Sequence, residues 1–130
     1  MTRHPSFALV AILLFLLASL AACRSDEEAA ALVTMEKALV RAEECVEVLR
    51  EHGGDMKATL KALAVVRRRH FDAIFEFRRI GTTTQKRLSP ADGERVTQRL
   101  SALHSEARDL LGKYNEEERK DLAFTLSTLQ

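Results

Sequence analysis

The sequence predicts an all-α protein, a small helical bundle that follows an N-terminal targeting segment. Beyond Ser25 the apolar residues recur at intervals of three and four, and no stretch alternates with the two-residue period of a β-strand. The chain has 130 residues, of which 46% are apolar and 30% charged, so we expect one modest domain. Its 20 basic and 19 acidic residues give a formal net charge of +1, which does not indicate a nucleic-acid partner.

Residues 1–22 have the organisation of an export signal. Arg3 precedes sixteen residues without a charge, from Phe7 to Ala22, and small residues end this run. As a helix the run would cover roughly 24 Å, less than the ~30 Å hydrocarbon core of a bilayer. A cleaved signal peptide is therefore favoured over a permanent membrane span.

The residues Leu20-Ala21-Ala22-Cys23 resemble the lipobox of bacterial lipoproteins. The resemblance implies that Cys23 receives a diacylglyceryl group and that signal peptidase II cuts before it. It also implies a membrane anchor of fatty acyl chains such as palmitate. Each methylene of such a chain that is buried in the bilayer contributes about 0.8 kcal/mol to membrane binding. Because Arg24 and not Asp follows the cysteine, the resemblance favours the periplasmic face of the outer membrane over the inner membrane. An ordinary secretory signal and an uncleaved anchor are the alternatives.

The first helix is predicted over residues 26–52. Ser25 and Glu28 form the pattern of a capping box at its start. An apolar stripe follows and stops at His52-Gly53-Gly54; it consists of Leu32, Met35, Leu39, Ala42, Val46 and Leu49. The expected organisation is thus a signal peptide (1–22), a lipidated cysteine with a short tether (23–28) and a helical domain (29–130).

A second helix is predicted from Asp55, its N-cap, to Ile80. The two-glycine link between these long helices favours an antiparallel hairpin. The polar residues 82–87 indicate a loop. Ser89-Pro90 then starts a third helix that breaks near Gly112, and Asn115 caps a short fourth helix.

Charge is divided unequally between the first two helices. Residues 25–52 have a balance of −5, and residues 55–87 a balance of +6. Opposite charges beside an apolar seam favour pairing of the two helices, so we expect Glu43, Glu44 or Glu47 near basic residues of the second helix. The run Arg67-Arg68-Arg69-His70 spans almost a full turn, so part of it must face solvent, an anionic head group or an acidic partner.

The aromatic cluster of the second helix is either core or a binding surface. Phe71, Ile74, Phe75 and Phe77 occupy an arc of roughly 160°, wider than one coiled-coil seam. We expect Phe71 and Ile74 in the core of the bundle. The alternative is an open apolar cradle, formed with Phe75, for a client chain or a lipid.

No catalytic motif is present in the sequence. It lacks a Gly-rich phosphate loop, Gly-x-Ser-x-Gly, His-Glu-x-x-His and Cys-x-x-Cys-His, and His52, His70 and His104 have no metal-ligand spacing. We therefore expect no enzyme activity, no cofactor and no metal. Cys45 adjoins the apolar seam and is expected to be half-buried; a disulfide-linked homodimer through Cys45 is the alternative.

A fainter resemblance concerns the third helix. Leu88-Ser-Pro-Ala-Asp92, with Tyr114-Asn-Glu-Glu-Glu118 further on, resembles the Leu-Thr-Pro-x-Gln helix starts of the periplasmic Spy/CpxP chaperones, although Ser replaces Thr and Asp replaces Gln. This resemblance implies a chaperone-like or lipid-binding cradle. The sequence as a whole favours a lipid-anchored, non-catalytic interaction or assembly module of the bacterial cell envelope, with a protein partner and no nucleic acid.

Overall fold

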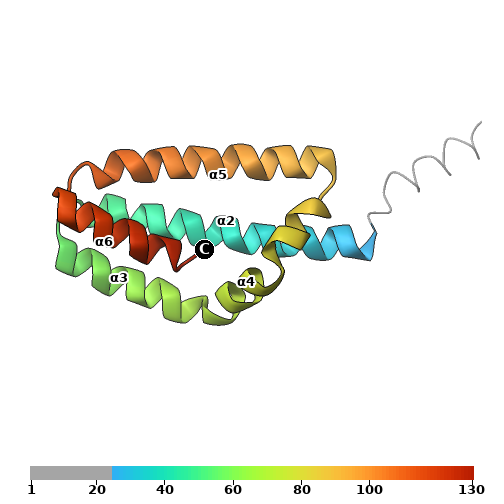
Figure 1. Ribbon diagram of the computed structural model, residues 1–130, viewed down its shortest axis with the longest axis horizontal. Helices are drawn as coiled ribbons and strands as arrows, with labels where there is room; N and C mark the ends of the chain where they lie inside the picture. The colour runs from blue at the N-terminus through green and yellow to red at the C-terminus, as the bar shows by residue number, and fades with distance from the viewer. Residues whose placement is uncertain (1–24) are drawn as a thin grey trace, which may run out of the picture.

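The computed structural model describes residues 25–130, and within this range the chain forms five helices and no strand (Figure 1). The helices are α2 (Asp26–Glu51), α3 (Met56–Arg69), α4 (Phe71–Lys86), α5 (Pro90–Leu111) and α6 (Glu116–Ser127). The prediction of an all-α bundle is confirmed. The predicted signal peptide and the predicted lipidation site Cys23 lie outside the described residues.

The long helix α2 is the centre of the bundle, and α3, α4 and α5 all contact it (Figure 1). Ser25 caps its start, because the Ser25 Oγ accepts a hydrogen bond of 3.2 Å from the backbone N–H of Glu28. The chain reverses at Gly54, whose φ of 87° is costly for a residue with a Cβ. α3 then returns antiparallel to α2, as predicted.

The segment predicted as one helix from Asp55 to Ile80 is broken at His70. His70 has φ −109° and ψ 17°, outside the usual helical values, and separates α3 from α4. Its ring Nε2 lies 2.7 Å from Glu44 Oε2 on α2, within hydrogen-bonding distance. The prediction of a continuous helix is therefore wrong, because a contact with a distant residue stabilises the break.

The predicted loop over residues 82–87 is also wrong, since α4 continues to Lys86. Gly81 and Thr84 are buried in the bundle. The Thr84 hydroxyl donates a 3.0 Å hydrogen bond to the Ile80 carbonyl, which satisfies it within the helix. Packing of this turn outweighs the weak local preference of three successive threonines for non-helical structure.

The predicted starts of the last two helices are confirmed. Ser89 caps α5, with Pro90 in its first turn. At the start of α6 the Asn115 side chain accepts from the Glu118 N–H at 2.8 Å, and Glu118 accepts from the Asn115 N–H at 3.2 Å. α5 runs parallel to α2, and α6 runs antiparallel to it (Figure 1).

The core has two parts. One cluster joins α2 to α3, α4 and α6 and includes Leu49, Leu63, Ile74, Leu122 and Leu129. The other joins α2 to α5 and consists of Met35, Leu39, Val46, Val96 and Leu103, with Phe77 of α4 packed against it. Both clusters use the apolar stripe of α2, which explains why this helix is central.

The acidic residues of α2 pair mainly with α5. Glu36 binds Arg95 at 2.6 Å and Glu43 binds Arg99 at 3.2 Å. The expected pairing with the second helix holds for Glu44, which lies 3.3 Å from Arg69. Glu43 pairs with α5 instead, because α5 lies along the face of α2 that this residue occupies.

Candidate functional site

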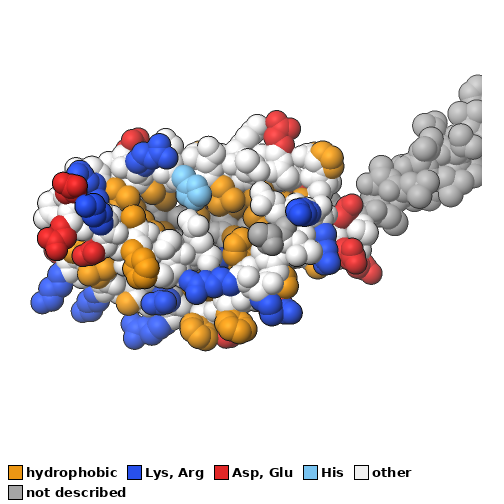
Figure 2. All heavy atoms as spheres, viewed as in Figure 1, with side chains coloured by type: hydrophobic (Ala, Val, Ile, Leu, Met, Phe, Trp, Pro, Cys, Tyr) orange, Lys and Arg blue, Asp and Glu red, His pale blue; other side chains and the backbone are white. Residues whose placement is uncertain are grey.

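The basic run at the end of α3 is only partly neutralised within the bundle. Arg69 pairs with Glu44, whereas Arg67 and Arg68 are exposed and have no ion-pair partner among residues 25–130. Figure 2 shows basic and apolar side chains next to one another along the edge formed by α3 and α4. Two of the three arginines predicted to face an anionic partner are thus free to do so.

The aromatic cluster divides between surface and core. Phe71 and Phe75 are 63% and 66% exposed, so the prediction of Phe71 in the core is wrong. Ile74 is 6% exposed and belongs to the first core cluster, as predicted. The break at His70 sets the orientation of α4, and Ile74 then faces the core while Phe71 and Phe75 face solvent.

We define the α3–α4 surface by Arg67, Arg68, Phe71 and Phe75. Arg67 and Arg68 lie in the last turn of α3, Phe71 and Phe75 lie one turn apart at the start of α4, and all four are exposed. Exposed aromatic side chains beside unpaired arginines are typical of protein interfaces, in which aromatic residues and Arg are enriched. The α3–α4 surface is the first candidate site.

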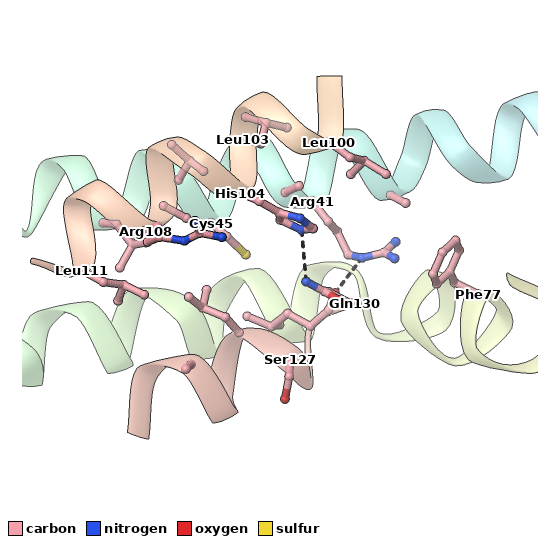
Figure 3. Close-up of a pocket in the computed structure, with 18 residues that line it drawn as sticks. Arg41, Cys45, Phe77, Leu100, Leu103, His104, Arg108, Leu111, Ser127 and Gln130 are labelled. Atoms are coloured by element: carbon pink, nitrogen blue, oxygen red, sulfur yellow. Dashed lines mark hydrogen bonds between the residues drawn. The ribbon is translucent and has the colours of Figure 1, made fainter. Parts of the chain in front are cut away.

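The second candidate site is a cavity of about 440 Å³ between α2, α5 and α6, with Phe77 of α4 at one end (Figure 3). This volume lies in the range of small-molecule sites. Most of the lining is apolar, and leucines from all three helices contribute to it. Among the described residues that line it there is no Asp or Glu; the polar ones are Arg41, His104, Arg108, Ser127 and Gln130.

Arg41 lines this cavity and is 2% exposed. Its Nε donates a 3.0 Å hydrogen bond to the Leu129 carbonyl, and its guanidinium lies 5.5 Å from the centre of the Phe77 ring. The two terminal nitrogens, Nη1 and Nη2, are buried and have no hydrogen-bond partner among the described residues. Burial lowers the pKa of the guanidinium below its ordinary value, because it penalises the charged form.

Cys45 is a free thiol on the wall of the same cavity. Burial raises its pKa to about 11, with a smaller contribution from Glu44 and an opposing one from Arg41. A buried thiol that holds its proton so firmly reacts slowly, because the thiolate is the reactive form. Cys45 is 8% exposed and thus more deeply buried than the half-burial expected from the sequence.

The histidines lie apart from one another in the fold. His52 ends α2, His70 separates α3 from α4, and His104 lines the cavity, where its Nε2 lies 3.4 Å from the Gln130 amide nitrogen. Residues 25–130 contain no group of three or more His, Cys, Asp or Glu side chains arranged to hold a metal ion. No helix in the same range is long and apolar enough to cross a membrane.

Sequence reasoning missed Arg41 and the cavity. A signal for Arg41 exists, since it lies four residues before Cys45 and seven before Val48, and both of these are buried on α2. An arginine in such an apolar stripe indicates a buried charge. The cavity itself left no pattern, because it arises where three helices pack incompletely.

Comparisons of the chain with protein-family models, curated proteins and solved structures found no match.

Proposed function

We propose that this chain is a lipid-anchored, non-catalytic interaction module of the bacterial cell envelope that binds an acidic protein partner through the α3–α4 surface. The observation that supports the proposal is the exposure of Phe71 and Phe75 next to Arg67 and Arg68, which have no acidic partner in the described bundle. Two exposed phenylalanines one helical turn apart provide apolar anchors of the kind that dominate binding energy at interfaces.

Charge favours an acidic partner over a neutral one. Unpaired arginines attract an acidic surface during encounter and fix its orientation once bound. They also form bidentate hydrogen bonds with carboxylates, which a neutral surface does not provide. The partner we expect therefore has acidic residues around an apolar groove that accepts the two phenylalanine rings.

Site-specific photocrosslinking in native membranes tests this proposal. A photoreactive phenylalanine analogue at position 75 should capture one protein, and the same analogue at the exposed Val33 of α2 should not capture it. The double variant Arg67→Glu/Arg68→Glu should reduce capture strongly, and the crosslinked peptide of the partner should be acidic. Equal capture at positions 75 and 33, or crosslinks to lipid alone, would refute the proposal.

The membrane anchor rests on the lipobox resemblance at Cys23. Radiolabelled palmitate should enter the wild-type chain and not Cys23→Ser. Globomycin, which blocks signal peptidase II, should cause the uncleaved form to accumulate. Fractionation of the envelope should place the protein in the outer membrane, on its periplasmic face. Equal labelling of the wild type and Cys23→Ser would rule out the anchor.

A lipid-binding cradle is the second candidate function, and one observation favours it. Its expected place, the face from Phe71 to Phe77, is only partly open, since Phe71 and Phe75 are exposed whereas Ile74 lies in the core. The cavity between α2, α5 and α6 offers instead an apolar space that a lipid chain would fit.

A further inference from the structure

The lining of the cavity combines a largely apolar wall with buried positive charge. Arg41, which is buried, and Arg108, which is exposed, both line it, and the described lining residues include no Asp or Glu. Figure 3 shows the Arg41 guanidinium directed toward Phe77 at one end, with Arg108 and Leu111 toward the other. Because Arg108 is exposed to solvent and Arg41 is buried, the space suits a ligand that is apolar along its length and negatively charged at the end that meets Arg41.

Arg41 is the residue that indicates the charge of this ligand. Its hydrogen bond to the Leu129 carbonyl comes from Nε alone, and Nη1 and Nη2 have no hydrogen-bond acceptor among the described residues. Buried arginines in proteins are normally paired, because an uncompensated charge in a dry interior is costly. Two adjacent guanidinium nitrogens bind the two oxygens of a carboxylate or phosphate in parallel, which would satisfy both donors at once.

Gln130 lines the same cavity as Arg41. Gln130 is exposed and lies beside Arg41 in Figure 3; its amide nitrogen makes one long contact of 3.4 Å, to His104. For a head group to reach Nη1 and Nη2 from the cavity, neighbouring side chains such as that of Gln130 would have to move, because both nitrogens are buried. The apolar wall from α5 and α6 would then hold the rest of the ligand.

We propose that the cavity binds a single-chain amphiphile with an anionic oxygen head group, the head group on Arg41 and the alkyl chain between α2, α5 and α6. A free fatty acid and a single-chain phospholipid share this chemistry. The site lies apart from the α3–α4 surface and does not depend on the partner proposed above, since the two share no residue.

Photolabelling of the full chain in isolated membranes tests the site. The probe is a palmitate analogue with a diazirine at the far end of its alkyl chain, and the labelled peptides are identified by mass spectrometry. We expect label on cavity residues of α5 or α6, competed by unlabelled palmitate. Label confined to α3, to residues of α4 other than Phe77 or to the outer faces of the bundle would overturn the proposal.

Two variants with matched controls test which residues are responsible. Arg41→Met should lower labelling by about tenfold while Arg41→Lys retains part of it. Arg95→Met should leave labelling unchanged, because Arg95 is exposed, pairs with Glu36 and does not line the cavity. Ala123→Trp, which fills the cavity from an exposed position, should abolish labelling, and Ala102→Trp on the exposed side of α5 should not. Thermal melts identify any variant that fails to fold. Full labelling of a folded Ala123→Trp chain would refute the site.

The head group is tested with probes of equal chain length. Hexadecyl phosphate and palmitate analogues should both compete with the photolabel for the cavity. Stronger competition by the phosphate would identify a phospholipid as the natural ligand, and stronger competition by palmitate a fatty acid. A hexadecanol analogue should label at least tenfold less, because an alcohol does not neutralise Arg41. Equal labelling by the alcohol would overturn the role of the anionic head group.

Discussion

Ile74 and Phe71 lie three positions apart on α4, yet the Ile74 side chain is almost fully buried and the Phe71 ring is mostly exposed. Residue type alone would place both in the core, since each is large and apolar. What separates them is the direction of α4 after the break at His70. Stability should therefore depend on Ile74, and binding on Phe71.

Truncation of these two side chains should give opposite results. In purified residues 24–130, Ile74→Ala should lower the free energy of unfolding by about 2 to 5 kcal/mol, because it leaves a cavity in the core. Phe71→Ala should change it by less than about 0.5 kcal/mol, as is usual for exposed positions. Urea unfolding with the parent protein as reference measures both. A larger loss for Phe71→Ala than for Ile74→Ala would contradict the assignment.

The pH dependence of Cys45 alkylation tests whether its thiol is buried. Its pKa of about 11 is well above that of a free thiol, about 8.5, so little thiolate is present near neutral pH. The rate of alkylation by iodoacetamide should rise about tenfold per pH unit up to pH ~10 and level off near 11. Residues 24–130 contain no other cysteine, so the rate reports Cys45 alone.

The same shift links stability to pH. The folded state holds the Cys45 proton more tightly than the unfolded state. The free energy of unfolding should therefore fall as the pH rises from the unfolded pKa of the thiol toward 11. In urea, where the chain is unfolded, alkylation at pH 8 should be much faster than in buffer. Equal rates in urea and in buffer would show that Cys45 is accessible in the fold.

At the scale of the helix, α6 is held at both ends by polar contacts. The capping box of Asn115 and Glu118 satisfies backbone donors at its start. Arginines from two other helices donate to the carbonyls that follow its end, Arg41 to Leu129 and Arg78 to Thr128. Cations at this end also interact favourably with the helix dipole. A helix of 12 residues would be marginal without such contacts and its packing in the bundle.

Removal of the cap should weaken α6 measurably. Asn115→Ala in residues 24–130 should lower the free energy of unfolding by about 0.5 to 2 kcal/mol, because the backbone N–H of Glu118 loses its side-chain partner. Asn115→Asp should retain most of the stability, since Asp caps equally well. The comparison is made by urea unfolding. No loss for Asn115→Ala would show that α6 is not part of the cooperative unit.

Helix starts were predictable because their signals are local, whereas the break at His70 was not. Ser25, Asp55, Ser89 and Asn115 each bond to a backbone N–H three residues away. The break instead depends on Glu44, which is 26 positions from His70. The helical spacing of apolar residues also continues across His70 without interruption, since residues of both α3 and α4 contribute to one core cluster.

At the scale of the whole molecule, the sequence predicts which residues are charged and exposed better than it predicts how the helices pack against one another. The exposure of Arg67 and Arg68 follows from their crowding on one turn, so this part of the site was predictable. The cavity and the unpaired Arg41 nitrogens depend on the distances between α2, α5 and α6, which no local pattern encodes. Segment charges likewise predicted the negative balance of α2 but not that Glu36 and Glu43 would pair with α5.

The parallel packing of α5 on α2 can be tested by exchange of charges. Glu43 lies 3.2 Å from Arg99, and both side chains are about half exposed. Glu43→Arg and Arg99→Glu should each lower the free energy of unfolding slightly, and the double variant should recover most of the loss. Exposed pairs of this kind contribute about 0 to 1 kcal/mol, so the recovery is small but measurable in a double-mutant cycle.

The control exchanges Glu43 with Arg68, the pairing that segment charges alone would suggest. Arg68 has no ion-pair partner among residues 25–130, so the double variant Glu43→Arg/Arg68→Glu should recover nothing relative to its single variants. High salt should reduce the coupling between positions 43 and 99, because exposed charges are screened within about 10 Å at 0.1 M. Recovery with Arg68 and not with Arg99 would show that α3, and not α5, covers this face of α2.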